Sequence, residues 1–196
     1  PVSDQVVKGS GVAMRRGTLY GVGVGPGDPD LITVKAVHVL RTADKIFAAC
    51  STKNDYSLSQ NIVTKHIGET DIEKMPFPMT RDRNALNEAW EKNAKRVLEV
   101  LRAGLDAAFI TLGDPLTFST FSYLLRTIRR LDPRIEVKTV PGITSYQAGA
   151  AAANTPLTEG EESLHLISGA RGGAKLRQIV ESAENIVMLK AYKNFA

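Results

Sequence analysis

Leu19-Tyr20-Gly21-Val22-Gly23-Val24-Gly25-Pro26-Gly27-Asp28-Pro29 is the stretch that decides the fold, because an apolar run gives way to glycines and a helical pattern follows. Small ligands contact the backbone at such strand-to-turn junctions of a parallel sheet. The glycine spacing does not fit the dinucleotide fingerprint, since its third glycine would fall on Pro26 or on Asp28. Proline lacks an N–H and aspartate adds negative charge, so the turn predicts a ligand other than a phosphate.

Around this stretch, short apolar segments alternate with longer amphipathic ones. The alternation is typical of βαβ units, so the predicted fold class is α/β with a parallel sheet. We expect strands at 19–24, 45–49, 107–111, 137–140, 164–168 and 185–189. The expected helices cover 30–41 (capped by Asp30), 58–65, the segment from the cap Asp82 to Gly104, about 118–130, 143–154 (tightly packed) and 175–182.

The chain divides at a polar segment, residues 155–162, which contains proline and glycine and has the composition of a linker. We expect residues 1–16 to be a flexible leader and residues 17–154 to form an N-terminal α/β domain. Residues 155–196 are too few for a core of their own. They either extend the first sheet or begin a C-terminal α/β domain, and we expect the second arrangement.

Composition limits the possible functions of the 196 residues, which carry a formal net charge of +4 and one cysteine, Cys50. A single cysteine rules out an internal disulfide framework and fits a cytoplasmic protein. The positive residues are scattered and the chain has no apolar run long enough to span a bilayer, so we expect neither a nucleic-acid nor a membrane partner. The three histidines are widely separated, which gives no metal site.

Three glycine- and proline-containing turns each follow a predicted strand: Gly25-Pro26-Gly27, Leu112-Gly113-Asp114-Pro115 and Pro141-Gly142-Ile143-Thr144-Ser145. Each alone is an ordinary turn sequence. Because the carboxyl ends of parallel strands line one crevice, the three turns together predict a shared site. The site would offer backbone groups, one carboxylate and small hydroxyls, which suits a ligand with amide-like edges or a cationic centre.

In this order, from Gly17 onward, the three turns resemble those of the tetrapyrrole (precorrin/corrin) methyltransferase family, which uses S-adenosylmethionine. The resemblance implies two α/β domains with the cofactor cleft between them, a tetrapyrrole substrate and a homodimer. It also implies that S-adenosylmethionine is converted to S-adenosylhomocysteine when it gives up its methyl group. The residues that it places at the cofactor are Gly25, Pro26, Gly27, Leu112, Gly113, Asp114, Thr117, Thr144, Ser145 and either Met188 or Leu189.

Within the family, Ser51-Thr52-Lys53, Met75-Pro76-Phe77-Pro78-Met79 and the segment 113–123 are most similar to enzymes that methylate C20 of precorrin-2 or cobalt-factor II in vitamin B12 synthesis. Phe118 stands where those enzymes usually have tyrosine. Two alternatives stay open, a sister enzyme that acts at another ring position and a non-catalytic tetrapyrrole-binding module. Family members usually continue for some tens of residues, so we expect the complete protein to extend beyond Ala196.

The reaction that the resemblance implies is attack of an electron-rich ring carbon on a sulfonium methyl, which depends on alignment more than on an activated side chain. A group must still remove a proton or stabilise charge on the macrocycle. Asp114 and Tyr123 are the candidates for this catalytic role. The candidates for binding the substrate carboxylates are Lys53, Arg81 and Arg83, with Arg171 as a further cation.

Overall fold

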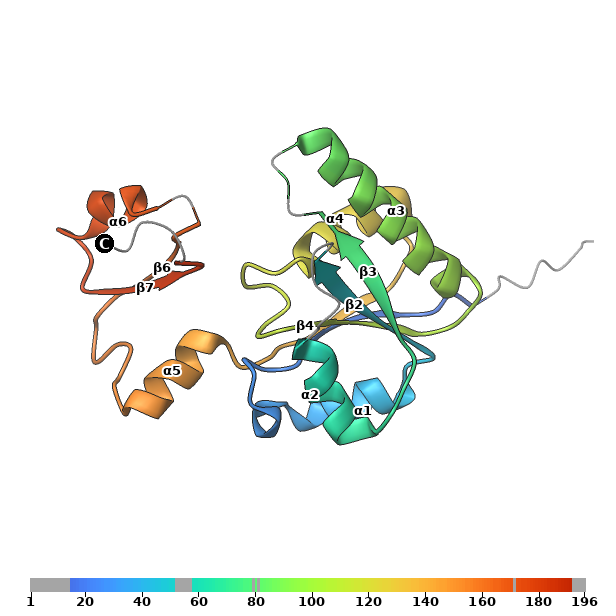
Figure 1. Cartoon of the computed structure of the whole chain (residues 1–196), viewed down its shortest axis with the longest axis horizontal. Coiled ribbons are helices and arrows are strands. Elements are labelled where there is room, and N and C mark those ends of the chain that lie inside the picture. The colour runs from blue at the N-terminus through green and yellow to red at the C-terminus, as the bar shows by residue number, and fades with distance from the viewer. Residues whose placement is uncertain (1–14, 52–57, 79, 81, 171, 192–196) are drawn as a thin grey trace, which may run out of the picture.

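The computed structural model describes residues 15–51, 58–78, 80, 82–170 and 172–191. Its main body is a five-stranded sheet, all of it parallel, in the order β3-β2-β4-β1-β5 (Figure 1). The strands are β1 (Leu19–Gly23), β2 (Lys45–Ser51), β3 (Ile72–Phe77), β4 (Ala107–Thr111) and β5 (Val137–Val140). The predicted α/β class and parallel sheet are confirmed.

Helices cover both faces of this sheet (Figure 1). On one face, α3 (Arg83–Arg102) and α4 (Phe121–Leu131) pack over Phe47, Phe109 and Leu19. On the other, α1 (Val34–Thr42) and α2 (Leu58–Ile67) pack over Ile46 and Ile110. The central strands β1 and β4 are buried on both faces, which explains why they are nearly continuous apolar runs in the sequence.

The first helix begins later than its sequence pattern predicted. Asp28 caps a short 3-10 turn, η1 (Pro29–Leu31), by accepting a hydrogen bond from the N–H of Asp30. Thr33 then caps α1 through the N–H of Ala36, so Asp30 is not the cap. α4 likewise begins at Phe121 rather than Phe118, because 118–120 form a turn in which the Ser119 hydroxyl accepts the N–H of Phe121.

The strand β3 was missed, because Pro76 lies within it and proline is a weak strand signal. Its position explains how the proline is tolerated: β3 is the edge strand and pairs on one side only, with β2. The predicted helix 143–154 is present as α5 (Ser145–Ala153), but none of its residues is buried. The expectation that its small side chains pack tightly is therefore wrong for the chain as described.

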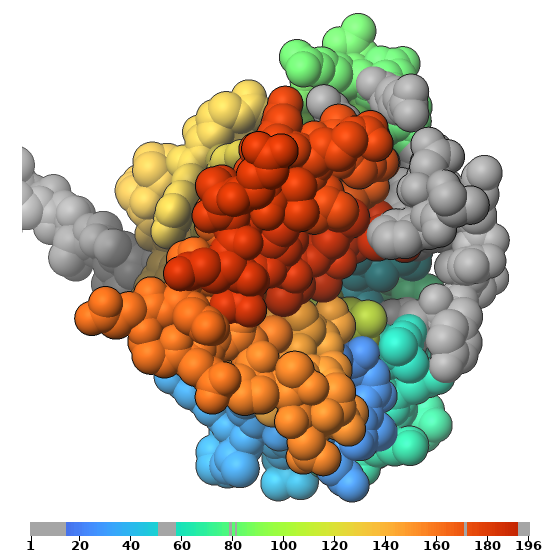
Figure 2. Space-filling view, turned by 90° about the vertical axis from the view of Figure 1, so that its left-hand side faces the viewer, coloured from blue at the N-terminus to red at the C-terminus, as the bar shows by residue number. Residues whose placement is uncertain are grey.

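Beyond α5, β6 (Leu164–Ser168) and β7 (Asn185–Leu189) form a separate parallel pair, with the short helix α6 (Ala174–Ile179) between them. Figure 1 and Figure 2 both show this small unit beside the five-stranded body, with α5 next to it. The strands occur where the sequence placed them, and they do not extend the first sheet. The boundaries at residues 16 and 154 stay predictions, although Arg16 itself is bound to Asp132 at 2.8 Å.

Candidate functional site

The three predicted turns come together at one edge of the sheet. They follow β1, β4 and β5, which are neighbours in the sheet order. The N–H of Gly113 donates to the carbonyl of Gly25 at 2.7 Å and closes an isolated antiparallel bridge between the first two turns. Both glycines have positive φ, +84° for Gly25 and +69° for Gly113, which disfavours a side chain at either position. The shared crevice expected from the sequence therefore has a physical basis.

Close backbone approach joins the third turn to the other two. A Cβ built on Gly142 would lie 2.2 Å from the carbonyl oxygen of Gly113, and one on Gly23 would lie 2.5 Å from the same atom. Any side chain at Gly142 would therefore force the backbones apart. We call Gly23, Gly25, Gly113 and Gly142 the glycine junction.

Asp114 holds the site together through both carboxylate oxygens. Its Oδ1 accepts from the N–H of Leu116 at 2.9 Å and from the hydroxyl of Thr117 at 3.1 Å. Its Oδ2 accepts from the N–H of Gly142 at 3.3 Å, across to the third turn. The carboxylate thus connects two turns, and three donors fix its orientation.

The third turn ends as the start of α5. Thr144 caps this helix in a capping box with Gln147, whose side-chain oxygen accepts from the Thr144 N–H at 3.0 Å. Thr144 is buried, while Ser145 is exposed in the first turn of the helix. The hydroxyl of Thr144 is therefore engaged in the local fold, in hydrogen bonds with Gln147.

The three turns present an exposed apolar side chain and unobstructed backbone, and none of their residues is cationic. Leu112, which follows β4, is 46 % exposed. A Cβ built on Gly27 would meet only a methyl of Leu58, at 3.8 Å, so the backbone there is open to a ligand. The charged residue within the turns, Asp114, and its counterpart just after the first turn, Asp28, are both acidic, which disfavours a polyanion.

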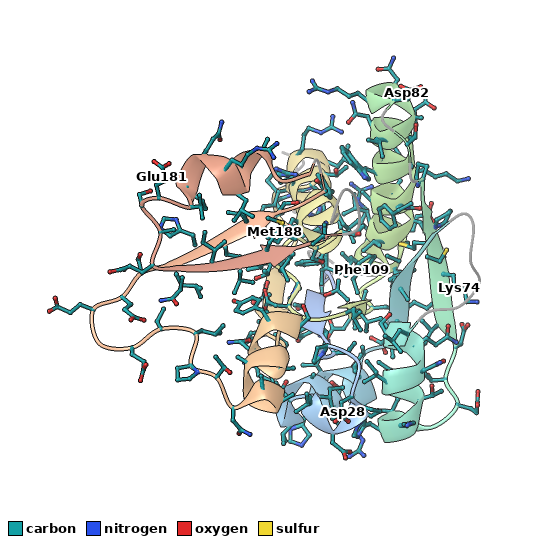
Figure 3. All side chains as sticks on the ribbon, turned by 60° about the vertical axis from the view of Figure 1, so that its left-hand side comes forward. Asp28, Lys74, Asp82, Phe109, Glu181 and Met188 are labelled. Carbon is teal, nitrogen blue, oxygen red and sulfur yellow. The ribbon has the colours of Figure 1, made fainter. Side chains whose placement is uncertain are left out.

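Met188 and Leu189 lie on β7, in the small unit, and are partly buried. In Figure 3, Met188 is drawn between Glu181, on the outer side of the unit, and Phe109 of the five-stranded sheet. The Leu189 carbonyl accepts the N–H of Gly169 at 2.7 Å, which fixes the end of β7 within its unit. The sulfur of Met188 lies beside Gly169, where an added Cβ would be 2.7 Å away.

Tyr123 is not brought together with the glycine junction. Its ring stacks on that of Trp90, with the two centroids 4.6 Å apart. The guanidinium of Arg126, also on α4, lies 4.9 Å from the centroid of the Tyr123 ring. These side chains line a hollow of about 460 Å³ between α3 and α4, with Asn87, Glu91, Thr127 and Arg130. Tyr123 thus faces this groove rather than the three turns.

Of the residues expected to bind the substrate carboxylates, only Arg83 is among those that the structure describes. Arg83 is the exposed first residue of α3, immediately after the cap Asp82, which Figure 3 labels at the end of that helix. Lys53, Arg81 and Arg171 lie outside the described residues. No cluster of metal-ligating side chains occurs among the residues that the structure describes. In that same part of the chain, no helix is both long and apolar enough to cross a membrane.

Two features of the site escaped the sequence patterns. Thr111 ends an otherwise apolar strand with a buried hydroxyl, and a threonine at a strand end is too ordinary to be a signal in the sequence. Phe118 and Lys190 both have positive φ, 49° and 57°, and the Lys190 ammonium lies 5.8 Å from the Phe118 ring centroid. No sequence pattern predicts this contact, because 72 positions separate the two residues.

The comparisons with known proteins show the family of the chain. The family model described as Tetrapyrrole (Corrin/Porphyrin) Methylases matches residues 18–196. A Methanocaldococcus jannaschii protein named "Probable cobalt-precorrin-2 C(20)-methyltransferase" is 38% identical over 172 residues, covering 88% of this chain and 71% of that protein. The cobalt-precorrin-2 C(20)-methyltransferase of Salmonella typhimurium is 36% identical over 181 residues, covering 92% and 75%.

A solved structure is also similar in fold. The crystal structure of a cobalamin synthesis related protein, CobF, of Corynebacterium diphtheriae matches with a TM-score of 0.71 at 26% identity, covering 91% of this chain and 73% of that one. The fold, the glycine junction and the family match point the same way, and the reaction of the family is methyl transfer. The chain belongs to the tetrapyrrole (corrin/porphyrin) methylase family.

Proposed function

We propose that the chain transfers a methyl group from S-adenosylmethionine to C20 of a precorrin-2-type tetrapyrrole in cobalamin biosynthesis, with the cobalt-bearing compound as substrate. The family supports the class of reaction. The names of the relatives from M. jannaschii and S. typhimurium support the ring position and the cobalt. The observation that carries the proposal is the glycine junction, because it holds the turns after β1, β4 and β5 against one another and so lets them line one crevice at the carboxyl ends of these strands.

The residues present fit S-adenosylmethionine. Leu112 offers exposed apolar surface, Gly27 leaves the backbone open, and the nearby carboxylate of Asp114 is compatible with a cation. When bound, S-adenosylmethionine supplies an electrophilic methyl group on a cationic sulfonium. We propose the cofactor contacts that the family resemblance implies, which are residues 25–27, 112–114, 117, 144, 145 and either Met188 or Leu189.

The chain's own residues act in this proposal mainly by positioning. The hydrogen bonds from Leu116 and Thr117 orient the Asp114 carboxylate within its own turn, and the one from the Gly142 N–H ties that turn to the third. Holding two reactants in line accounts for much of the rate of such a transfer. We therefore propose Asp114 as a positioning residue. Tyr123 stays a predicted candidate for proton transfer, and Arg83, Lys53 and Arg81 stay predicted partners of the substrate carboxylates, as do the homodimer and the cytoplasmic location.

The test is turnover by the full-length protein with S-adenosylmethionine whose methyl carbon is isotopically labelled. Cobalt-factor II and metal-free precorrin-2 are supplied in parallel, and the labelled carbon of the product is located by NMR and mass spectrometry. We expect one label at C20 and faster turnover of the cobalt compound. A label on another carbon indicates a sister enzyme instead. Tight binding of both tetrapyrroles without any transfer indicates a binding module.

A further inference from the structure

The first of the three turns is contacted by a helix that contributes no residue to the glycine junction. This turn, residues 25–27, leads into η1, and α2 packs against η1. At the start of α2, a methyl group of Leu58 lies 3.8 Å from the position of a Cβ built on Gly27. At the end of the same helix, the ring of His66 forms a hydrogen bond with η1. The helix therefore contacts the region of the first turn at both of its ends.

The hydrogen bond of His66 has a defined direction. Its Nε2 lies 2.8 Å from the carbonyl oxygen of Pro29, the first residue of η1. A carbonyl oxygen only accepts hydrogen bonds, so Nε2 carries a proton and donates it. The backbone carbonyl of His66 accepts a bond from the guanidinium of Arg41 on α1 at 3.1 Å. The end of α2 is thus bound to α1 by its backbone and to η1 by its imidazole.

The short turn η1 connects Pro29 to the glycine junction. It is closed by the N–H of Ile32, which donates to the Pro29 carbonyl at 3.2 Å. The carbonyl oxygen of its last residue, Leu31, lies 2.9 Å from the position of a Cβ built on Gly25. Gly25 in turn accepts the N–H of Gly113 at 2.7 Å. Because these backbones touch, a displacement of Pro29 also displaces the first turn.

The fold as a whole does not require the imidazole. His66 and Pro29 are both half-buried, so water can hydrogen-bond the Pro29 carbonyl when the ring is removed. Loss of the bond therefore changes the local freedom of η1 more than the stability of the whole chain. A ligand that binds one arrangement of a turn has its apparent affinity reduced to the fraction of molecules that hold this arrangement. Ligand affinity is thus the property that depends on the imidazole.

We infer that His66 is a positioning residue for the cofactor. Its Nε2–H group holds η1, and η1 holds residues 25–27 in the arrangement that binds S-adenosylmethionine. The imidazole acts through the Pro29 backbone and contacts neither reactant. The inference rests on the proposed function, because it concerns the cofactor site of that reaction.

The test compares His66→Leu and His66→Gln with the unchanged full-length protein. Leucine keeps a side chain of similar size without a donor, whereas glutamine has an amide N–H that can donate to the same carbonyl. S-adenosylhomocysteine is titrated by calorimetry. We expect His66→Leu to weaken its binding about five-fold, the effect of one neutral hydrogen bond, and His66→Gln to restore most of the affinity. The unfolding midpoint of both variants should stay close to that of the unchanged protein.

Turnover separates positioning of the cofactor from a general loss of structure. With cobalt-factor II as the acceptor, His66→Leu should raise KM for S-adenosylmethionine about five-fold. At saturating S-adenosylmethionine, kcat and KM for the tetrapyrrole should be unchanged. A fall in kcat with unchanged KM for S-adenosylmethionine contradicts the inference.

A second measurement does not depend on a variant. NMR of the nitrogen-15-labelled His66 ring at pH 8 should show the proton of the neutral imidazole on Nε2. A proton on Nδ1 alone overturns the inference, because Nε2 could then not donate to Pro29.

His38→Leu is the matched control. His38 is exposed on the neighbouring helix α1, and its ring makes no hydrogen bond within the described part of the chain. We expect this variant to bind S-adenosylhomocysteine as the unchanged protein does. Unchanged affinity in His66→Leu, or equal weakening in His66→Leu and His66→Gln, overturns the inference and leaves the proposed function intact. Failure of the unchanged protein to bind S-adenosylhomocysteine and to methylate any tetrapyrrole refutes the proposed function and the inference with it.

Discussion

At the scale of single residues, the glycine junction depends on the absence of a side chain at Gly142. Gly142→Ala would place a Cβ 2.2 Å from the Gly113 carbonyl oxygen and 2.8 Å from the backbone of Gly23. Backbone atoms cannot move aside as a flexible side chain can, so we expect unfolding free energy to fall by about 1–3 kcal/mol. We also expect S-adenosylhomocysteine binding to be lost. Urea unfolding and calorimetry measure the two effects.

Gly149→Ala is the control for that substitution. Gly149 lies in α5, and a Cβ built there meets nothing within 4 Å. The same chemical change is expected to stabilise the protein by about 0.5–1 kcal/mol, because alanine favours helix more than glycine does. Equal behaviour of the two variants would contradict the role given to the glycine junction.

The residues of the three turns could be predicted because each turn follows a strand with an unambiguous apolar pattern. The role of Asp114 could not, since its bond to the N–H of Gly142 joins segments 28 positions apart. Thr111 could not be predicted from the sequence for a different reason. A threonine at a strand end is ordinary, and only its lack of a described partner makes it notable.

At the scale of secondary-structure elements, Asp132 connects three segments at the end of α4. Its side chain is 4 % exposed and contacts Arg16 at 2.8 Å, Arg102 at 3.3 Å and Arg134 at 3.5 Å. Burial alone would raise the pKa of this carboxyl. The hydrogen bonds from the Arg134 backbone and the Arg102 side chain, with the charge of Arg16, outweigh burial and hold the pKa below its usual value.

A carboxyl with a lowered pKa stabilises the fold above the pKa of the unfolded chain, and that contribution is lost as the pH falls through the folded-state pKa. We expect Asp132→Asn to lower unfolding free energy by about 1–3 kcal/mol at pH 7. Below pH 4 the difference from the unchanged protein should shrink. Urea unfolding between pH 3 and pH 7 tests this. Glu91→Gln, which removes exposed pairs with Lys95 and Arg130, should leave stability nearly unchanged across this pH range.

Element prediction succeeded where burial and periodicity agreed, as in β4, whose five residues are all buried. It failed where position in the fold decided the outcome. β3 tolerates Pro76 because it is an edge strand, and the sequence does not say which strand lies at an edge. The small residues of α5 indicated close packing, yet none is buried among the described residues.

At the scale of the whole molecule, the proposed cofactor site draws on two units. The glycine junction belongs to the five-stranded body, whereas Met188 and Leu189 belong to the β6–β7 pair. Figure 3 places Met188 on the side of that pair nearer the body. A ligand that contacts both units stabilises the folded chain according to its affinity for the folded form. The ligand-induced rise in Tm therefore reports whether both units contribute to binding.

S-adenosylhomocysteine at 100 times its dissociation constant should add about 2.7 kcal/mol to the stability of the unchanged protein. For a chain of this size, that raises Tm by roughly 5–10 °C. Met188→Ala should leave the ligand-free Tm within about 2 °C, because the residue is only partly buried, and should reduce the ligand-induced shift at the same concentration. Val180→Ala, at an exposed position after α6, should keep the full shift. A full shift in Met188→Ala would remove Met188 from the cofactor site and leave Leu189 as the residue of β7 to test next, because the two strand neighbours point to opposite faces of the pair.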